Sequence, residues 1–231
     1  MKSRYSFLLA SLVALSSSSA LAKGRVDGIY TGVMFDDEID RATETVPPVT
    51  VPLGKNNAIG GTVVAGFGFE VNNWVLALEA DATLHSGKEV WSNESWWGPA
   101  LTSVGLVPGD YTASTKFRRS FGFLARYGYT FDDVVFLYGS VGWVQSWLGT
   151  RVTDVSDPAA PVAIKFKDHI SGIRYGGGVE VPVTKDLSIR GDYLHTNYKN
   201  YLYEISDGTN FYDVSVNPSA DTFRLGLAFH W

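Results

Sequence analysis

The residues best suited to acid–base chemistry in this sequence are four histidines: His85, His169, His195 and His230. A histidine beside a serine can hydrolyse an ester, so His195, which precedes Thr196 and Asn197, is the first candidate. Side chains of a strand alternate between its faces, and no serine shares the face of His195 at a spacing of two in this segment. We therefore expect no catalytic residue here and no enzymatic activity.

Metal ligation and phosphate binding are the other chemistries to test. The chain has no cysteine, and its histidines lack metal-ligand spacing. The acidic run from Asp36 to Asp40 lacks the glycine and the terminal glutamate of a calcium loop, so we expect a solvated loop there. The glycines at 176–178 precede no predicted helix and form no phosphate loop. The sequence therefore predicts no metal and no cofactor.

The first residues form a targeting segment. Lys2 and Arg4 precede a short apolar run, Phe7 to Leu15, and Ala20-Leu21-Ala22 fits a small-residue cleavage site. We expect a secretory signal peptide at 1–22 and one domain at 23–231. The formal charge of the whole chain is −5, which is unfavourable for binding nucleic acid.

The rest of the chain alternates between predicted strands and connections. The strands are expected near 25–35, 58–71, 73–84, 115–129, 133–146, 166–183, 186–198 and 220–231. The connections 36–57, 85–114, 147–165 and 199–219 are long, and those between them are tight. All prolines but Pro182 fall in the long connections, as expected for strands that need every backbone donor. Long and short connections in alternation are typical of outer-membrane barrels.

Charged residues fall on one face of the predicted strands, and apolar residues on the other. The inward set is Glu70, Glu79, Asp81, Glu180 and Asp192 with Arg118, Arg126, Arg174, Arg190 and Arg224. A soluble sandwich would bury so many charges only at a large free-energy cost, whereas a small membrane barrel turns its polar face inward. The pattern predicts an all-β fold, a closed transmembrane antiparallel up-and-down β-barrel of about eight strands.

Aromatic residues are predicted to mark both edges of the membrane. The periplasmic girdle would comprise Phe69, Trp74, Tyr129, Phe131 and Trp231, and the outer one Trp143, Trp147, Tyr198, Tyr201 and Tyr203. The final strand, Thr222 to Trp231, alternates to its last residue. We expect it to pair with the first strand, because a barrel in lipid leaves no open edge.

Three stretches carry a family resemblance: "GGGVEVPVTKDLSIRGDYLHTNY" from Gly176, "LYGSVGWV" from Leu137 and the terminal "LGLAFHW". They resemble the small outer-membrane β-barrel proteins of Gram-negative bacteria, the opacity and porin-like superfamily. Within it, the chain is most similar to the alpha-proteobacterial major outer-membrane immunogen group. The resemblance implies a Gram-negative outer-membrane location. It also implies that Phe229 and Trp231 form the signal read by the barrel-assembly machinery.

The outer connections hold the remaining candidates for ligand binding. Trp91, Trp96 and Trp97 lie in the longest one, where they would either contact a sugar or a host protein or fold onto the barrel mouth and membrane interface. Lys116, Arg118 and Arg119 begin a predicted strand at the outer rim. We expect them to contact lipopolysaccharide phosphates, because Arg119 points toward lipid by alternation unless the register is shifted by one residue.

Four functions are compatible with the sequence: a structural barrel for envelope integrity and surface exposure, a narrow porin-like channel, a loop-mediated adhesin, and an enzyme. Eight strands leave an interior that side chains can fill. The predicted charges would plug it, which favours a closed barrel. The expected partners are outer-membrane lipid and lipopolysaccharide, the assembly machinery, and a surface ligand at the loops.

Overall fold

The computed structural model describes residues 27–46, 49–86, 91–92, 111–132, 134–154, 162–206 and 211–231. The predicted signal peptide at 1–22 lies outside these residues, as do Trp96 and Trp97. Within them, no helix is long and apolar enough to cross a membrane.

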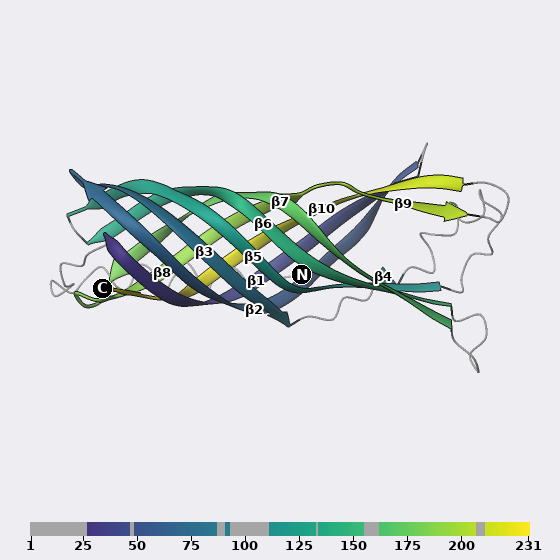
Figure 1. Ribbon diagram of the computed structural model, residues 1–231, viewed down its shortest axis with the longest axis horizontal. Helices are drawn as coiled ribbons and strands as arrows, with labels where there is room; N and C mark the ends of the chain where they lie inside the picture. Colours follow the sequence, from purple (N-terminus) through teal and green to yellow (C-terminus); the bar gives the residue numbers. More distant parts are fainter. Residues whose placement is uncertain are drawn as a thin grey trace, which may run out of the picture.

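The chain folds into a closed β-barrel (Figure 1). Its strands are β1 (Gly28–Val46), β2 (Val49–Val71), β3 (Trp74–Ser86), β4 (Trp91–Ser92), β5 (Tyr111–Phe131), β6 (Val135–Asp154), β7 (Val162–Pro182), β8 (Leu187–Tyr198), β9 (Tyr201–Ser206) and β10 (Phe211–His230). The eight long strands form the ring β1-β2-β3-β5-β6-β7-β8-β10, and β10 pairs antiparallel with β1. The predicted all-β, eight-stranded closed barrel is confirmed.

Strict alternation places each side chain on one wall of the barrel. In β3, Leu76 and Leu78 are 51% and 65% exposed on the outer wall, while Val75 and Glu79 are buried in the lumen. A wall that is apolar outside and charged inside suits a surrounding of lipid. The predicted inward and outward faces of this strand are confirmed.

Tight turns join the strands at one end of the barrel. Asn72 and Asn73 form a two-residue turn with φ of 50° and 69°, as a hairpin that follows the twist of its strands requires. At the turn before β8, the Thr184 hydroxyl accepts hydrogen bonds from the N–H groups of Asp186 (3.3 Å) and Leu187 (3.1 Å). The short connections therefore lie where the sequence predicted them.

The predicted long connections were wrong in extent, because the strands run far into them. β1 continues to Val46 and β2 begins at Val49, so most of 36–57 is a paired hairpin. The acidic run lies in a strand and not in a solvated loop. Asp36, Glu38 and Asp40 are buried in a polar lumen, where Arg224 and Thr222 lie opposite the first two.

Two prolines also lie within strands, which corrects their predicted exclusion. Pro52 in β2 lies beside a register shift against β1. Pro218 in β10 lies between Val216, the last residue paired with β9, and Ser219, the first paired with β8. Both prolines therefore sit at interruptions of regular pairing, where a missing backbone donor is tolerated.

Beyond the closed part, the strands continue as two four-stranded sheets. The β2–β3 pairing ends at Ile59 and Ser86, and the β7–β8 pairing at Gly172 and Tyr198. Further out, β9-β10-β1-β2 form one sheet and β4-β5-β6-β7 the other, and we call them the two arms (Figure 1). β2 has 23 residues, whereas about 9–11 cross a bilayer. The arms therefore project beyond a membrane on the side opposite the tight turns.

Candidate functional site

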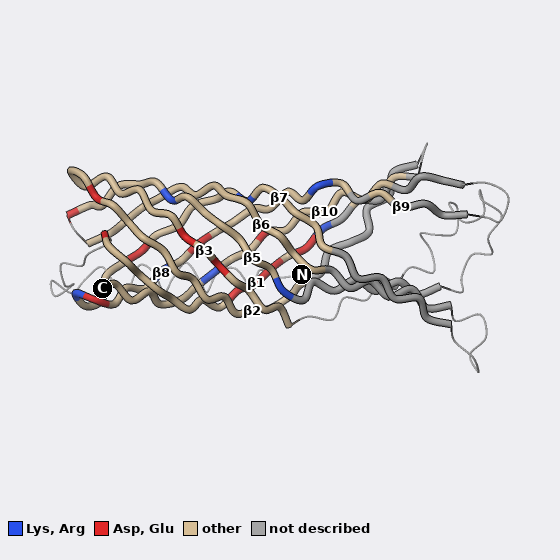
Figure 2. Tube along the Cα trace, in the orientation of Figure 1, with Lys and Arg blue, Asp and Glu red and all other residues tan. Residues whose placement is uncertain are grey.

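The lumen of the barrel holds the densest set of charged side chains in the described residues, and Figure 2 shows where charged residues of both signs lie along the strands of the barrel. Those at most 5% exposed are Asp36, Glu38, Asp40, Glu79, Asp81, Arg126, Arg174, Glu180, Arg190, Asp192 and Arg224. Buried charges are tolerated only when they are paired and hydrogen-bonded. The pairing of these groups therefore decides what the lumen can do.

One layer of the network crosses the full width of the lumen. Arg190 of β8 forms a bidentate ion pair with Glu79 of β3, in which Nη2 lies 3.1 Å from Oε1. β3 and β8 are four steps apart in either direction around the ring of eight strands. The Tyr30 hydroxyl donates a further hydrogen bond to Glu79 (2.9 Å). These contacts therefore connect opposite walls of the lumen.

Arg126 fills the centre of the same layer. Its Nη1 lies 3.2 Å from Glu180, and its Nε lies 3.6 Å from Glu79. The guanidinium carbon lies 4.8 Å from the ring centroids of both Tyr30 and Tyr138, so the cation is held between two aromatic faces. Two carboxylates and two rings therefore fix this side chain, which is 1% exposed.

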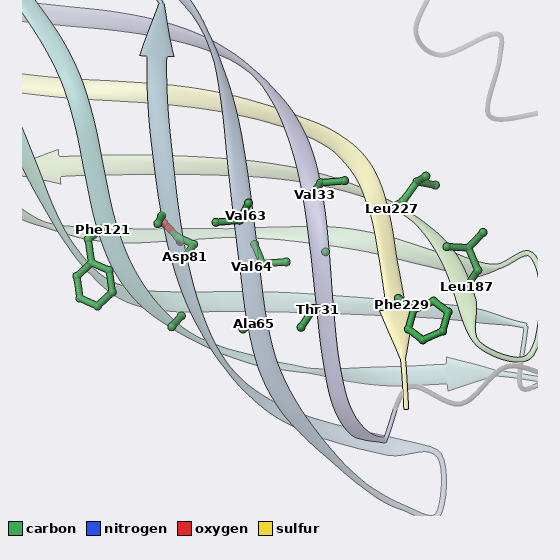
Figure 3. A pocket seen from close by; sticks show the side chains of 13 residues that line it. Thr31, Val33, Val63, Val64, Ala65, Asp81, Phe121, Leu187, Leu227 and Phe229 are labelled. Atoms are coloured by element: carbon green, nitrogen blue, oxygen red, sulfur yellow. The ribbon is translucent and has the colours of Figure 1, made fainter.

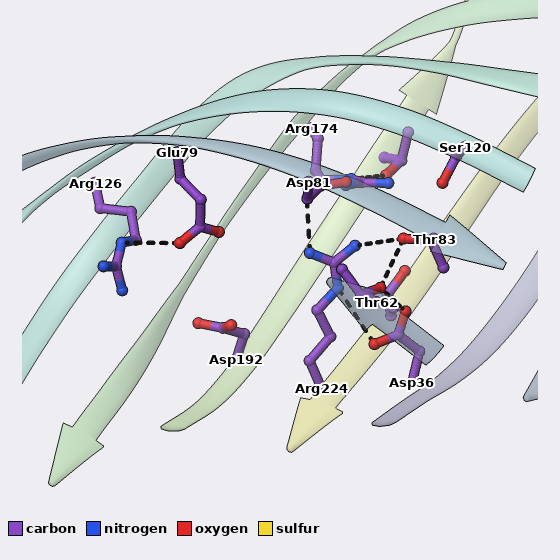
Figure 4. A network of polar contacts seen from close by, with 12 residues as sticks. Asp36, Thr62, Glu79, Asp81, Thr83, Ser120, Arg126, Arg174, Asp192 and Arg224 are labelled. Atoms are coloured by element: carbon purple, nitrogen blue, oxygen red, sulfur yellow. Dashed lines mark hydrogen bonds and ion pairs between the residues drawn. The ribbon is translucent and has the colours of Figure 1, made fainter. Parts of the chain in front are cut away.

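A second layer is organised by Asp81 (Figure 4). Arg174 reaches both oxygens of Asp81 at 3.0 and 3.2 Å, and Arg224 Nη1 lies 3.4 Å from Oδ2. The Arg224 side chain also lies 3.5 Å from Asp36, which accepts a hydrogen bond from Thr62. The second layer therefore links β1, β2, β3, β7 and β10.

The polar network continues toward the tight turns. Glu180 Oε1 accepts a hydrogen bond from the Ser188 hydroxyl (2.7 Å) and lies 2.6 Å from His230 Nε2. His230 is 4% exposed, and its ring centroid lies 5.6 Å from that of Tyr30. These contacts therefore occupy the described part of the lumen near the tight turns.

Inward glycines make room for these large side chains. A Cβ at Gly66 would lie 2.3 Å from the Tyr30 ring, and one at Gly178 would lie 2.3 Å from Asp192 and 2.5 Å from the Tyr138 hydroxyl. Glycine at these two positions therefore lets the network cross from wall to wall.

Most of the predicted lumen charges are brought together. Eight lie in the network: Glu79, Asp81, Arg126, Arg174, Glu180, Arg190, Asp192 and Arg224. Glu70 is half-buried near a turn. Arg118 lies at a register shift between β5 and β6, and its side chain is outside the described set. The sequence reading missed Asp36, Glu38, Asp40, His85 and His230; the first three continue the alternation of strand one past Phe35, which was the available signal.

The residues of the predicted periplasmic girdle lie on the outer wall near the tight turns, whereas of the predicted outer girdle only Trp143 and Trp147 are described there. Trp74 stacks on Tyr127, and its ring centroid lies 5.2 Å from that of Tyr129. Trp231 is 72% exposed and contacts Phe229 edge-to-face. Tyr198 is a correction, because it faces the lumen and its hydroxyl lies 3.0 Å from Ser146. The side chains of Tyr201 and Tyr203 are outside the described set.

Of the residues predicted to make contacts outside the barrel, the structure describes the side chain of Arg119 but not that of Trp91. Arg119 is exposed on the outer wall, with its guanidinium carbon 4.8 Å from the Trp147 ring centroid. Arg119 therefore faces outward as alternation predicted, although the β5–β6 pairing does shift in register between Phe117 and Arg119. Trp91 lies in β4, paired with Ala113 of β5, and its side chain is outside the described set.

A shallow hollow of about 600 Å³ lies mainly on the outer wall (Figure 3). Small residues, including Thr31, Ala65 and Ala80, form its floor, and Leu227 and Phe229 form one side. Lipid acyl chains are the natural filling of such an apolar surface in a membrane wall.

No serine contacts His195 among the described residues, and its ring nitrogens lie 2.7 Å from Asp221 and 3.1 Å from Asn197. His85 lies between Ser120 (3.5 Å) and Glu38 (3.4 Å), an order that resembles a hydrolytic triad. Ser120 is only 3% exposed, however, and both distances are long for catalytic hydrogen bonds. These three residues therefore extend the lumen network.

Comparisons with known proteins agree with this architecture. A family model described as "Outer membrane protein beta-barrel domain" matches residues 6–230. No curated protein matches the chain. The outer-membrane protease OmpT of Escherichia coli superposes with a TM-score of 0.53 at 10% identity, covering 89% of this chain and 97% of that one. A major outer-membrane protein of Thermus thermophilus gives 0.49 at 13% identity, covering 85% and 98%. At these identities, the similarity shows the fold alone.

Proposed function

Because the chain belongs to the outer membrane protein β-barrel domain family, and its described lumen is crossed by ion pairs, we propose that it is a closed barrel with a structural, surface-exposed role in the envelope. Its location is the outer membrane of a Gram-negative type of cell. The observation that carries the proposal is the Arg190–Glu79 pair, which joins diametrically opposite strands. A solute crossing the lumen would have to displace it.

The alternative of a narrow porin-like channel is disfavoured by energetics. Removing one partner of a buried ion pair costs about 3–5 kcal/mol, because the other charge is left without compensation. Arg126, Arg174 and Arg190 are each 1% exposed and are held by carboxylates. Opening a path would break several such contacts at once, so the network supports a barrel without conduction.

Solute entry into liposomes tests this role. Vesicles loaded with stachyose and carrying the refolded barrel are diluted into an isotonic solution of a small sugar, and swelling is followed by light scattering. We expect the swelling rate of protein-free vesicles, with a known porin as the positive control. Swelling that depends on sugar size, from protein verified as folded, would support the channel.

A second candidate function, contact with a surface ligand, is favoured by the length of the strands. The arms extend past the membrane-spanning part; Trp91 lies in β4 of one arm, and Trp96 and Trp97 lie in the sequence between β4 and β5. A rigid sheet can present such segments away from the bilayer. We therefore place adhesion or ligand binding at the arms, and not in the lumen.

A narrower relationship within the family is also a proposal. The Gly176–Tyr198 stretch that resembles the alpha-proteobacterial immunogen group forms the end of β7, a tight turn and β8. Phe229 and Trp231 lie on the outer wall at the end of β10, 40% and 72% exposed. Their accessibility supports recognition of this end by the barrel-assembly machinery.

A further inference from the structure

A polar cluster lies on the outer wall where the first and last strands meet. Its members come from four neighbouring strands: Arg41 (β1), Tyr175 (β7), Tyr193, His195 and Asn197 (β8), and Asp221 (β10). We call these six residues the seam cluster. It is separate from the lumen network, because these positions alternate with the inward-facing ones.

Asp221 is the centre of the seam cluster. Its Oδ1 accepts a hydrogen bond from the Tyr193 hydroxyl (2.8 Å) and lies 2.7 Å from His195 Nδ1. Its Oδ2 forms an ion pair with Arg41 across the closure of the barrel. The carboxylate thus orients one ring, one imidazole and one guanidinium.

Asn197 and Tyr175 extend the cluster around the wall. The Asn197 side-chain N–H donates to the Tyr175 hydroxyl (3.4 Å), and its Oδ1 lies 3.1 Å from His195 Nε2. The rings of Tyr175 and His195 have centroids 5.3 Å apart. Neighbouring groups therefore hold these side chains in one arrangement, in which Asp221 is buried while Tyr175, Tyr193 and Asn197 stay exposed.

The seam cluster lies at the border of the apolar band. On β10, Asp221 directly follows Phe223, Leu225 and Leu227 in the series of outward positions, counted away from the tight turns, and these three are 44–46% exposed. Polar groups facing lipid chains are costly, whereas at the membrane interface they meet polar headgroups. The cluster therefore lies at the level of the outer-leaflet headgroups.

The chemistry of the cluster fits a saccharide. Tyr175 and Tyr193 are 45% and 42% exposed, so each presents apolar ring surface that can pack on the C–H face of a sugar. The exposed Asn197 amide can donate to and accept from sugar hydroxyls, and the partly exposed Arg41 guanidinium can donate to them. Because Arg41 and Asp221 neutralise each other, the cluster lacks the excess positive charge of a phosphate clamp.

We propose that the seam cluster binds the sugar headgroup of an outer-leaflet glycolipid, with Tyr175 and Tyr193 as stacking surfaces and Asn197 and Arg41 as hydrogen-bonding groups. The ligand lies outside the barrel and contacts β1, β7, β8 and β10, so it bridges the strand closure. The inference rests on the membrane location and does not depend on whether the lumen is closed.

Thermal unfolding in vesicles tests the proposal. The refolded protein is placed in phosphatidylcholine vesicles with or without lipopolysaccharide, and its heat-dependent gel mobility gives the unfolding midpoint. We expect lipopolysaccharide to raise the midpoint by about 5 °C. Tyr175→Ala and Asn197→Ala should lose at least half of this shift, and Tyr175→Phe less. The control Tyr127→Ala, an outward tyrosine near the tight turns, should keep all of it.

Two further vesicle compositions identify the recognised group. Lipopolysaccharide with its phosphates removed should still raise the midpoint, whereas the anionic phospholipid phosphatidylglycerol should not. An equal shift with phosphatidylglycerol, or the loss of the shift on dephosphorylation, would show that charge is recognised and would overturn the saccharide assignment. Equal shifts in wild type and all seam variants would overturn the site itself, while the liposome-swelling result would stand.

Discussion

Glu79 is the central carboxylate of the layer of ion pairs that crosses the lumen from β3 to β8. It pairs with Arg190 and Arg126 and accepts a hydrogen bond from Tyr30. Glu79→Ala leaves two buried guanidiniums without this carboxylate, so we expect a loss of about 3–5 kcal/mol in the free energy of unfolding, measured by urea titration in vesicles. Glu70→Ala, at a half-buried position, should cost less than about 1 kcal/mol.

Replacing both members of an ion pair with apolar residues tests whether the loss of stability comes from an uncompensated charge or from the lost side-chain volume. In Glu79→Leu with Arg190→Leu, neither charge of the central pair remains, so the double variant should be more stable than the Glu79→Ala variant. If Glu79→Ala were no less stable than Glu70→Ala, the ion pairs around Glu79 would not stabilise the barrel as described.

Adding one carbon atom at Gly66 tests how closely the side chains of the lumen are packed. A Cβ there would meet the Tyr30 ring at 2.3 Å and the Leu78 carbonyl oxygen at 2.7 Å. Gly66→Ala should therefore lower the free energy of unfolding by about 1–3 kcal/mol. At Gly61, the nearest atom to an added Cβ is the Met34 carbonyl oxygen at 3.9 Å, so Gly61→Ala is the matched control. Equal urea midpoints for the two variants would contradict the tight fit.

At the scale of the strands, alternation predicted the membrane-spanning part well. It placed Leu76 and Leu78 outside and Glu79 and Asp81 inside, because one wall meets lipid and the other meets charges. The alternation was misread where polar and apolar residues do not alternate clearly. From Asp36 to Asp40, four of five residues are acidic, so local propensity favoured a loop, whereas pairing with β2 and β10 and a polar lumen stabilise a strand.

The arms provide a prediction at the same scale. The closed ring is complete between the tight turns and the level of Ser86 and Arg119. Replacing residues 93–109 with a short Gly-Ser linker should therefore leave the unfolding midpoint within about 2 °C of wild type. If the arms bind a surface ligand, the same variant should lose adhesion to host cells. Circular dichroism and a cell-binding assay measure the two effects. Loss of the barrel itself would show that this connection is part of the folded core.

At the scale of the whole molecule, the sequence predicted the closed barrel and the inward charges, but not how they pair. Which arginine meets which carboxylate depends on strand shear around the ring. Arg190 and Glu79 are 111 residues apart in the chain and lie on opposite walls. The seam cluster was hidden for a related reason, since Arg41 and Asp221 become neighbours only when β1 and β10 close the ring.

Single-channel conductance of the refolded chain in a planar bilayer tests the closed barrel most directly. We predict no conductance steps from wild-type protein whose insertion is verified by heat-dependent gel mobility, because the Arg190–Glu79 and Arg174–Asp81 pairs cross the lumen. Replacing Glu79, Arg126 and Arg190 together by alanine should open small, salt-dependent steps. Steady steps from the wild-type protein, with a size that changes in this variant, would contradict the closed barrel and make the charged lumen the lining of a pore.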